Sequence, residues 1–173
     1  EILLGLVICL ILYVIIVIYR SIKKKDTSHN ADSPVILSGL IDADVGRIVK
    51  QNPNSNNSLT LKRSINENGI EFTYSLWIYI KGNTWETDSW KHVFHKGQAI
   101  NLGLDKDGAS PNEYCSIQCP GLWINPNNNS FRLYINTYNS INEFIDIDNL
   151  PVKKWINLTY TQSNFTAKVY ING

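Results

Sequence analysis

Acidic side chains in the segment "EFIDID" are the first residues whose types and spacing could support catalysis. Retaining glycoside hydrolysis needs two carboxyl groups about 5–5.5 Å apart, one acting as the acid and one as the nucleophile. In a strand, Asp146 and Asp148 would share one face about 7 Å apart, whereas Glu143 would point to the other face. A solvated edge strand explains these residues better, so we expect a protein that is not an enzyme.

An oxygen-rich loop, "LDKDGASPNE", is the candidate metal site. Asp105 and Asp107 supply carboxylates, Gly108 allows a turn, and hard cations such as Ca²⁺ prefer oxygen ligands. The further carboxylates of an EF-hand loop are missing, and a polar hairpin turn at Asp-Gly explains the same residues without a metal. Ca²⁺ is therefore the one cofactor that the sequence leaves open.

Two histidines and two cysteines complete the chemically active side chains. His92 and His95 are three residues apart in a predicted strand, so we expect them on opposite faces, where they cannot bind one ion together. Cys115 and Cys119 in "YCSIQCPG" could form a disulfide in an oxidising compartment or remain two free thiols in a reducing one. No serine elbow or glycine-rich phosphate loop accompanies them.

An aliphatic run at the N-terminus predicts a membrane anchor over residues 1–20. Ile2–Tyr19 carries no charge, and as a helix it would span about 27 Å, close to the thickness of a bilayer's hydrocarbon core. A cleaved signal peptide fits poorly, because no basic residue precedes the run and no small-residue cleavage site follows it. The predicted anchor residues are Ile2, Leu3, Leu4, Leu6, Val7, Ile8, Leu10, Ile11, Leu12, Val14, Ile15, Ile16, Val17 and Ile18.

Basic residues directly after this run predict the topology. Short flanks rich in Lys and Arg stay on the cytoplasmic side of a membrane, so the rest of the chain is expected to face the cytosol. The four flanking residues are Arg20, Lys23, Lys24 and Lys25. The net charge of the whole chain is only +1, which gives no field that would attract nucleic acid.

Side-chain alternation after the linker predicts an all-β domain. Residues 21–58 form the basic flank and an Asn- and Ser-rich linker, and the domain occupies residues 59–173. In "GIEFTYSLWIYIKG" apolar residues fall on one face, and Trp77 and Tyr79 on the second face suggest a central strand. The other strand candidates are "KHVFHKG" (91–97), "AINLGL" (99–104), "GLWIN" (121–125), "SFRLYINTY" (130–138), "EFIDI" (143–147), "KWINLTYT" (154–161) and "TAKVYING" (166–173).

Many short strands separated by turn residues, with no helical period after the anchor, indicate an antiparallel β-sandwich or barrel. The sequence stops at Asn172-Gly173, a strong hairpin signal, and begins with Glu1 rather than Met. We therefore expect further residues at both ends, including at least one partner strand.

Three segments resemble the laminin-G-like, or concanavalin A-like, jelly-roll domain: "FTYSLWIYIKG" at 72–82, "WKHVFHKG" at 90–97 and "KWINLTYTQSNFTAKVYING" at 154–173. The resemblance implies that Trp77 and Trp155 fill the sandwich core, and we expect Trp90 and Trp123 there as well. Trp85, in the loop "KGNTWETDSW", is the candidate anchor for a binding partner, with a loop folded over its own side chain as the alternative.

A narrower resemblance covers the anchor, the linker, "LTLKRSINENGIEFTYSLWIYI", "HVFHKG" and "PGLWINPNNNSFRLYINT". Together these are similar to membrane-anchored laminin-G-like proteins of large nucleocytoplasmic DNA viruses. The resemblance implies a structural minor capsid protein that tethers the virion's internal membrane to major and other minor capsid proteins, with its sandwich facing the capsid. A Ca²⁺-dependent, lectin-like protein that binds glycans on a surface is the alternative.

Overall fold

The computed structural model describes residues 9–19, 33–62, 70–82, 88–101 and 109–173, together with Gly5 and Ser64. The chain divides into two compact units, Glu1–Ser64 and Ile65–Gly173. The expected domain boundary near residue 59 stays a prediction.

The first unit contains one helix and a chain of turns. Residues 9–19 are helical, and residues 33–62 contain turns but no strand. Within the part of the chain that is described, no helix combines the length and the apolar character that crossing a bilayer requires. The predicted anchor residues Ile2, Leu3, Leu4, Leu6, Val7 and Ile8, and the basic residues Arg20, Lys23, Lys24 and Lys25, lie outside the described residues.

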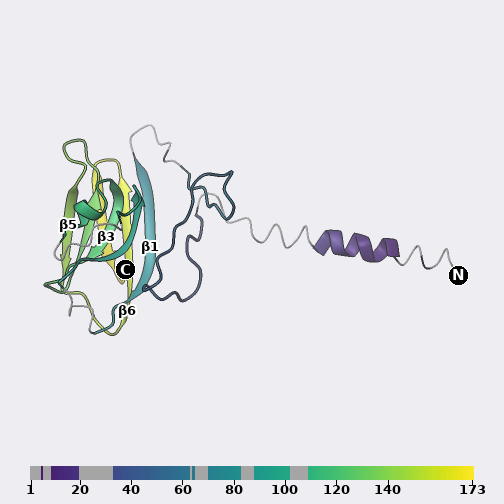
Figure 1. The fold of residues 1–173 in the computed structure, drawn as a ribbon, viewed down its shortest axis with the longest axis horizontal. Coiled ribbons are helices and arrows are strands. Elements are labelled where there is room, and N and C mark those ends of the chain that lie inside the picture. The colour runs from purple at the N-terminus through teal and green to yellow at the C-terminus, as the bar shows by residue number, and fades with distance from the viewer. Residues whose placement is uncertain are drawn as a thin grey trace. The chain divides into compact units, whose positions relative to one another are not determined.

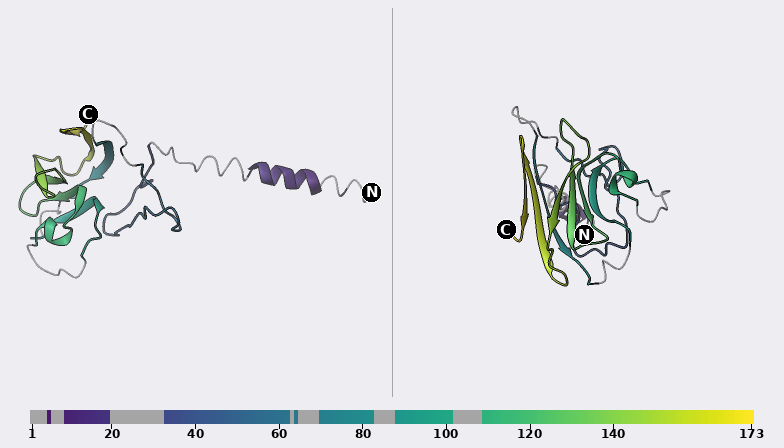
Figure 2. Two further views of the ribbon diagram at one scale, coloured as in Figure 1. Left: turned by 90° about the horizontal axis from the view of Figure 1, so that it is seen from above. Right: turned by 90° about the vertical axis from the view of Figure 1, so that its left-hand side faces the viewer.

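The second unit is a two-layer β-sandwich, as the alternating sequence pattern predicted (Figure 1). One antiparallel sheet has the strand order β1-β6-β7, and the other has the order β2-β3-β4-β5. Figure 2 shows the layers from two further directions. The elements are β1 (Glu71–Tyr79), β2 (Lys91–Gly97), α2 (Pro111–Tyr114), β3 (Gln118–Ile124), β4 (Ser130–Ile135), β5 (Glu143–Asp148), β6 (Trp155–Ser163) and β7 (Thr166–Ile171).

The main core lies between the inner faces of the two sheets. Strand alternation turns every second side chain inward, as the strictly alternating exposure along β1 shows. The three-stranded sheet contributes Leu158 and Tyr160, and the four-stranded sheet contributes Phe131 and Leu133, all of them 0% exposed. The buried members of this cluster are Ile80, Leu122, Ile124, Phe131, Leu133, Leu150, Ile156, Leu158 and Tyr160.

The tryptophans do not lie in this core, contrary to the expectation from the sequence. Trp77 is 65% exposed and Trp155 is 49% exposed, because the alternation that turns their neighbours Ile78 and Ile156 towards the core turns both indoles outward. β1 is also an edge strand of its sheet among the described residues, not the central strand that was predicted. The size of a side chain does not decide whether it lies in the core here. Its position in the inward-outward alternation of the strand decides it.

A second apolar cluster lies on the outer side of the four-stranded sheet. Trp123 is 2% exposed and packs with Cys115 and Tyr134. The segment that carries α2 covers it, with the Tyr114 and Trp123 rings stacked at 6.0 Å between centroids. Trp90 packs at the margin of this cluster and not in the main core.

The covering helix α2 was not predicted, because a four-residue helix shows no period. Its local signal is nevertheless present: Pro111 opens the helix, and the Glu113 carboxylate accepts hydrogen bonds from the Ser110 backbone N–H (2.7 Å) and hydroxyl (3.0 Å). The strand predicted at 99–104 is not formed at residues 99–101, and residues 102–104 lie outside the described part. All the other predicted strands are confirmed.

Replacing Leu158 by Ala tests the position of the main core. Removing this fully buried side chain leaves a cavity between the sheets, so the free energy of unfolding should fall by about 3 kcal/mol. Urea unfolding of the full chain measures it. Tyr138→Ala, at a side chain that is 104% exposed, is the control and should change stability by less than about 0.5 kcal/mol. Equal effects of the two substitutions would contradict the described core.

Candidate functional site

The outward side of the three-stranded sheet carries exposed aromatic rings, and we call it the aromatic face. It is defined by Trp77, Tyr79, Trp155 and Tyr170, whose exposed fractions are 65%, 46%, 49% and 42%. Tyr79 and Trp155 are opposite each other in the β1–β6 register, and their ring centroids are 5.6 Å apart. Exposed Trp and Tyr side chains grouped on one sheet surface are typical of surfaces that partners bind.

A closed ring of hydrogen bonds lies among these aromatics. The Asn157 amide Nδ2 donates to Ser75 Oγ (3.3 Å), and the Thr159 hydroxyl donates to Asn157 Oδ1 (3.1 Å). Ser75 Oγ and Thr159 Oγ1 are 3.0 Å apart, so the Ser75 hydroxyl donates to Thr159 and completes the cycle. These three side-chain bonds link β1 to β6 at the centre of the aromatic face, in addition to the backbone ladder between the two strands.

The far end of the same sheet surface is polar and hollowed. Asn164 takes a positive φ of 51° in the β6–β7 turn, and its backbone carbonyl accepts a hydrogen bond from Gln162 Nε2 at 2.7 Å. Phe165, next in the turn, is fully exposed. The residues that line the hollow, of about 380 Å³, are Thr161, Ser163, Asn164, Phe165, Thr166, Lys168 and Tyr170.

His92 and His95 lie on one side of β2, so the expectation that they face apart was wrong. The β2–β3 register shifts between His92 and Phe94, and this bulge adds one residue to the strand and reverses the alternation after it. As a result His92 Nε2 lies 2.8 Å from His95 Nδ1, with the ring centroids 4.9 Å apart.

The other hydrogen-bond partner of His95 shows which histidine of this pair is the donor. His95 Nε2 lies 2.7 Å from the backbone carbonyl of Gln98, which can only accept, so His95 Nε2 carries the hydrogen. In neutral His95 the Nδ1 atom is then the acceptor, and His92 Nε2–H is the donor. The thiol of Cys115 also donates to the Gln98 carbonyl, at 3.1 Å. The end of β2 is thereby fastened to the segment that covers Trp123.

The environment of His92 holds it neutral at pH 7. Burial of the ring, followed by repulsion from His95, lowers the pKa of His92 to about 4. Its ring contacts Trp123 edge to face, with 4.8 Å between centroids. The indole of Trp123 is held in turn by a 2.6 Å hydrogen bond from Nε1 to the buried Gln118 Oε1.

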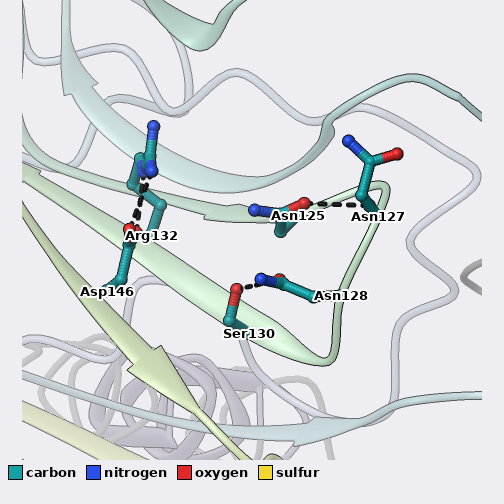
Figure 3. Close-up of polar contacts among 6 residues, drawn as sticks. All are labelled: Asn125, Asn127, Asn128, Ser130, Arg132 and Asp146. Atoms are coloured by element: carbon teal, nitrogen blue, oxygen red, sulfur yellow. Dashed lines mark hydrogen bonds and ion pairs between the residues drawn. The ribbon is translucent and has the colours of Figure 1, made fainter.

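Asp146, one of the carboxylates considered for catalysis, is engaged by an arginine (Figure 3). Both of its oxygens accept hydrogen bonds from Arg132, each at 2.7 Å, in the bidentate geometry that guanidinium groups favour. The guanidinium also lies 4.8 Å from the Trp90 ring centroid and 3.9 Å from that of Phe144. This arrangement joins β4 to β5 on the outer side of the sheet.

The β3–β4 turn beside this pair is built by asparagine side chains (Figure 3). Asn125 Oδ1 accepts a 2.8 Å hydrogen bond from the backbone N–H of Asn127, and Asn128 Oδ1 accepts one from the Ser130 hydroxyl. Asn129 donates to the backbone carbonyl of Leu150, while its Oδ1 is buried without a partner. Asparagine is therefore used here to close the turn.

The remaining predicted site residues are two aspartates, one tryptophan and two cysteines. Asp105, Asp107 and Trp85 lie outside the described residues. Cys115 is buried and Cys119 half-buried, and both are free thiols in the structure. The choice between two thiols and a bridge in an oxidising compartment stays a prediction. Within the described ranges, no group of three or more His, Cys, Asp or Glu side chains is arranged to hold a metal ion.

Sequence reasoning missed the aromatic face, although its signal was present. Ser75, Asn157 and Thr159 alternate in phase with Trp77 and Trp155, and such polar neighbours indicate the solvent side of a strand. Comparison of the chain with known protein families, curated proteins and solved structures found no match.

The lowered pKa of His92 predicts a pH-dependent stability. Between pH 6.5 and 4 the unfolded chain binds a proton at His92 that the folded chain does not. The contribution of neutral His92 to the free energy of unfolding should therefore be greatest above pH 6.5. It should fall by about 1 kcal/mol, after solvent screening, as the pH drops towards 4. Denaturant unfolding of the full chain and of His92→Gln across this range measures the effect. A slope that is identical in the two proteins would contradict the assignment.

Proposed function

We propose that this chain is a non-enzymatic, membrane-anchored docking protein whose β-sandwich binds a protein shell through the aromatic face. The observation that carries the proposal is the group of exposed rings at Trp77, Tyr79 and Trp155 around a hydrogen-bonded polar centre. Binding energy in protein interfaces concentrates in a few Trp, Tyr and Arg side chains near the centre of the contact. This face presents such a group on strands that need no rearrangement.

The N-terminal helix supports the anchor in this proposal. Each apolar side chain of residues 10–19 is exposed, with fractions from 43% at Val17 to 67% at Tyr13. A helix that is apolar on all sides is stable only when something apolar surrounds it, and lipid is the partner that the basic flank favours. The linker between anchor and sandwich would be residues 21–58, of which residues 33–58 are described and carry exposed apolar side chains at Leu40 (84%) and Ile48 (91%).

The finer setting of the proposal comes from the resemblance described above. The sandwich would be a laminin-G-like jelly roll, and the chain a minor capsid protein in the internal membrane of a large DNA virus. The membrane would hold the sandwich on its cytosolic side, facing the capsid proteins. Confinement near the shell raises the effective concentration of the domain, so contacts of modest affinity suffice for tethering.

Binding to virion shells from which the membrane has been removed tests the docking. The full chain in vesicles should co-sediment with the shells, and the double substitution Trp77→Ala, Trp155→Ala should weaken binding at least 30-fold, because each truncation removes a central anchor. Tyr138→Ala, at a fully exposed aromatic that is not part of the aromatic face, is the matched control and should bind like the wild type.

Two results would contradict the docking proposal. Shell binding that persists in the double variant would place the contact elsewhere on the chain. Calcium-dependent retention on a glycan array, with no binding to shells, would favour the lectin-like alternative. The polar hollow beside Tyr170 makes the array a necessary part of the experiment.

Protease accessibility tests the proposed topology. In intact particles the shell should protect the sandwich, and removing the shell while the membrane stays sealed should expose it to cleavage. Protection that persists until detergent is added would place the sandwich on the opposite side of the membrane.

A further inference from the structure

The bulge in β2 creates a pair of histidines that regular alternation would have separated. With one extra residue between them in the ladder, His92 and His95 occupy the same side of the strand, as residues two apart do in a regular strand. His92 Nε2 and His95 Nδ1 are 2.8 Å apart. The two imidazole nitrogens are therefore close enough for both to approach one small ion.

The surroundings of the pair resemble those of metal-binding histidines. Such histidines usually donate their second ring N–H to a backbone carbonyl or a carboxylate, which fixes the tautomer and aims the other nitrogen at the ion. His95 does this: its Nε2 lies 2.7 Å from the Gln98 carbonyl, which leaves the Nδ1 lone pair directed towards His92. The edge-to-face contact with the Trp123 ring restrains the His92 ring.

We propose that His92 and His95 form a two-histidine site for a divalent transition-metal ion of the zinc type, bound through His92 Nε2 and His95 Nδ1 and completed by water. Imidazole nitrogens lie about 2.0–2.1 Å from zinc, so two ligands at a tetrahedral angle are about 3.3 Å apart. The nitrogens here need to separate by roughly half an ångström, and both rings must turn so that their lone pairs meet at the ion and not along the line between the nitrogens. This requires a rotation of the partly exposed His92 side chain.

Metal binding requires no change of charge on the protein. The hydrogen on His92 Nε2 moves to His92 Nδ1, and the freed lone pair then coordinates the ion. The Cys115 thiol is not a ligand in this arrangement, because it donates to the carbonyls of Gln98 (3.1 Å) and Ile117 (3.3 Å). Two protein ligands make an open and exchangeable site, weaker than a closed structural zinc site with four.

Titration of the purified full chain with Zn²⁺ alone tests this site. Calorimetry should detect one equivalent bound to the wild type, and His92→Gln and His95→Gln should each weaken binding at least tenfold. His29→Gln, at the third histidine of the sequence, is the matched control and should bind like the wild type. Circular dichroism of each variant establishes that it is folded, so a lost fold is not mistaken for a lost ligand.

Ring-nitrogen NMR supplies a second readout that a merely structural histidine pair would not give. Zn²⁺ should shift His92 Nε2 and His95 Nδ1 together. Absence of this shift would mean that the pair shares a hydrogen only, and would overturn the proposal. Equal binding by wild type and His92→Gln would overturn it as well. Shell docking through the aromatic face is measured separately, and neither result decides the other.

Discussion

Contact between the inner faces of the two sheets is the interaction on which the other features of the sandwich depend. Leu158 and Tyr160 from one sheet meet Phe131 and Leu133 from the other, and all four are completely buried. Burying such side chains contributes about 1.5–3 kcal/mol each, so the inward phase of every strand is strongly fixed. Once that phase is set, the outward side chains have no freedom to exchange faces.

The two outer surfaces of the sandwich consequently differ in character. On the four-stranded sheet, the segment carrying α2 folds over Trp123 and produces a second, small apolar cluster. Within the second unit, the described residues place no such cover on the aromatic face, where Trp77 and Trp155 remain about half exposed or more. The second unit therefore covers one outer surface with its own chain and leaves the other open. This difference is the physical reason for placing the docking function on β1, β6 and β7.

Alternation in the sequence predicted the strands and the sandwich, because a period of two is a property of the backbone. It failed where a local event changed the phase or the length. The bulge near Val93 moved His95 to the side of His92, and no pattern in "KHVFHKG" announces it. The capping residues of α2 were readable, but a single turn of helix has no period. Trp77 and Trp155 were misassigned because their core position was taken from the family resemblance, although the polar neighbours on their face indicate the solvent side.

Hydroxyl-radical footprinting of the free full chain tests the central claim, that the phase of the strands leaves these indoles facing solvent, most directly. Oxidation is expected to be fast at Trp77 and Trp155 and slow at Trp123, in line with exposed fractions of 65%, 49% and 2%. Protection of Trp77 to the same degree as Trp123 would contradict the account, because it would mean that the free protein already covers the face assigned to its partner.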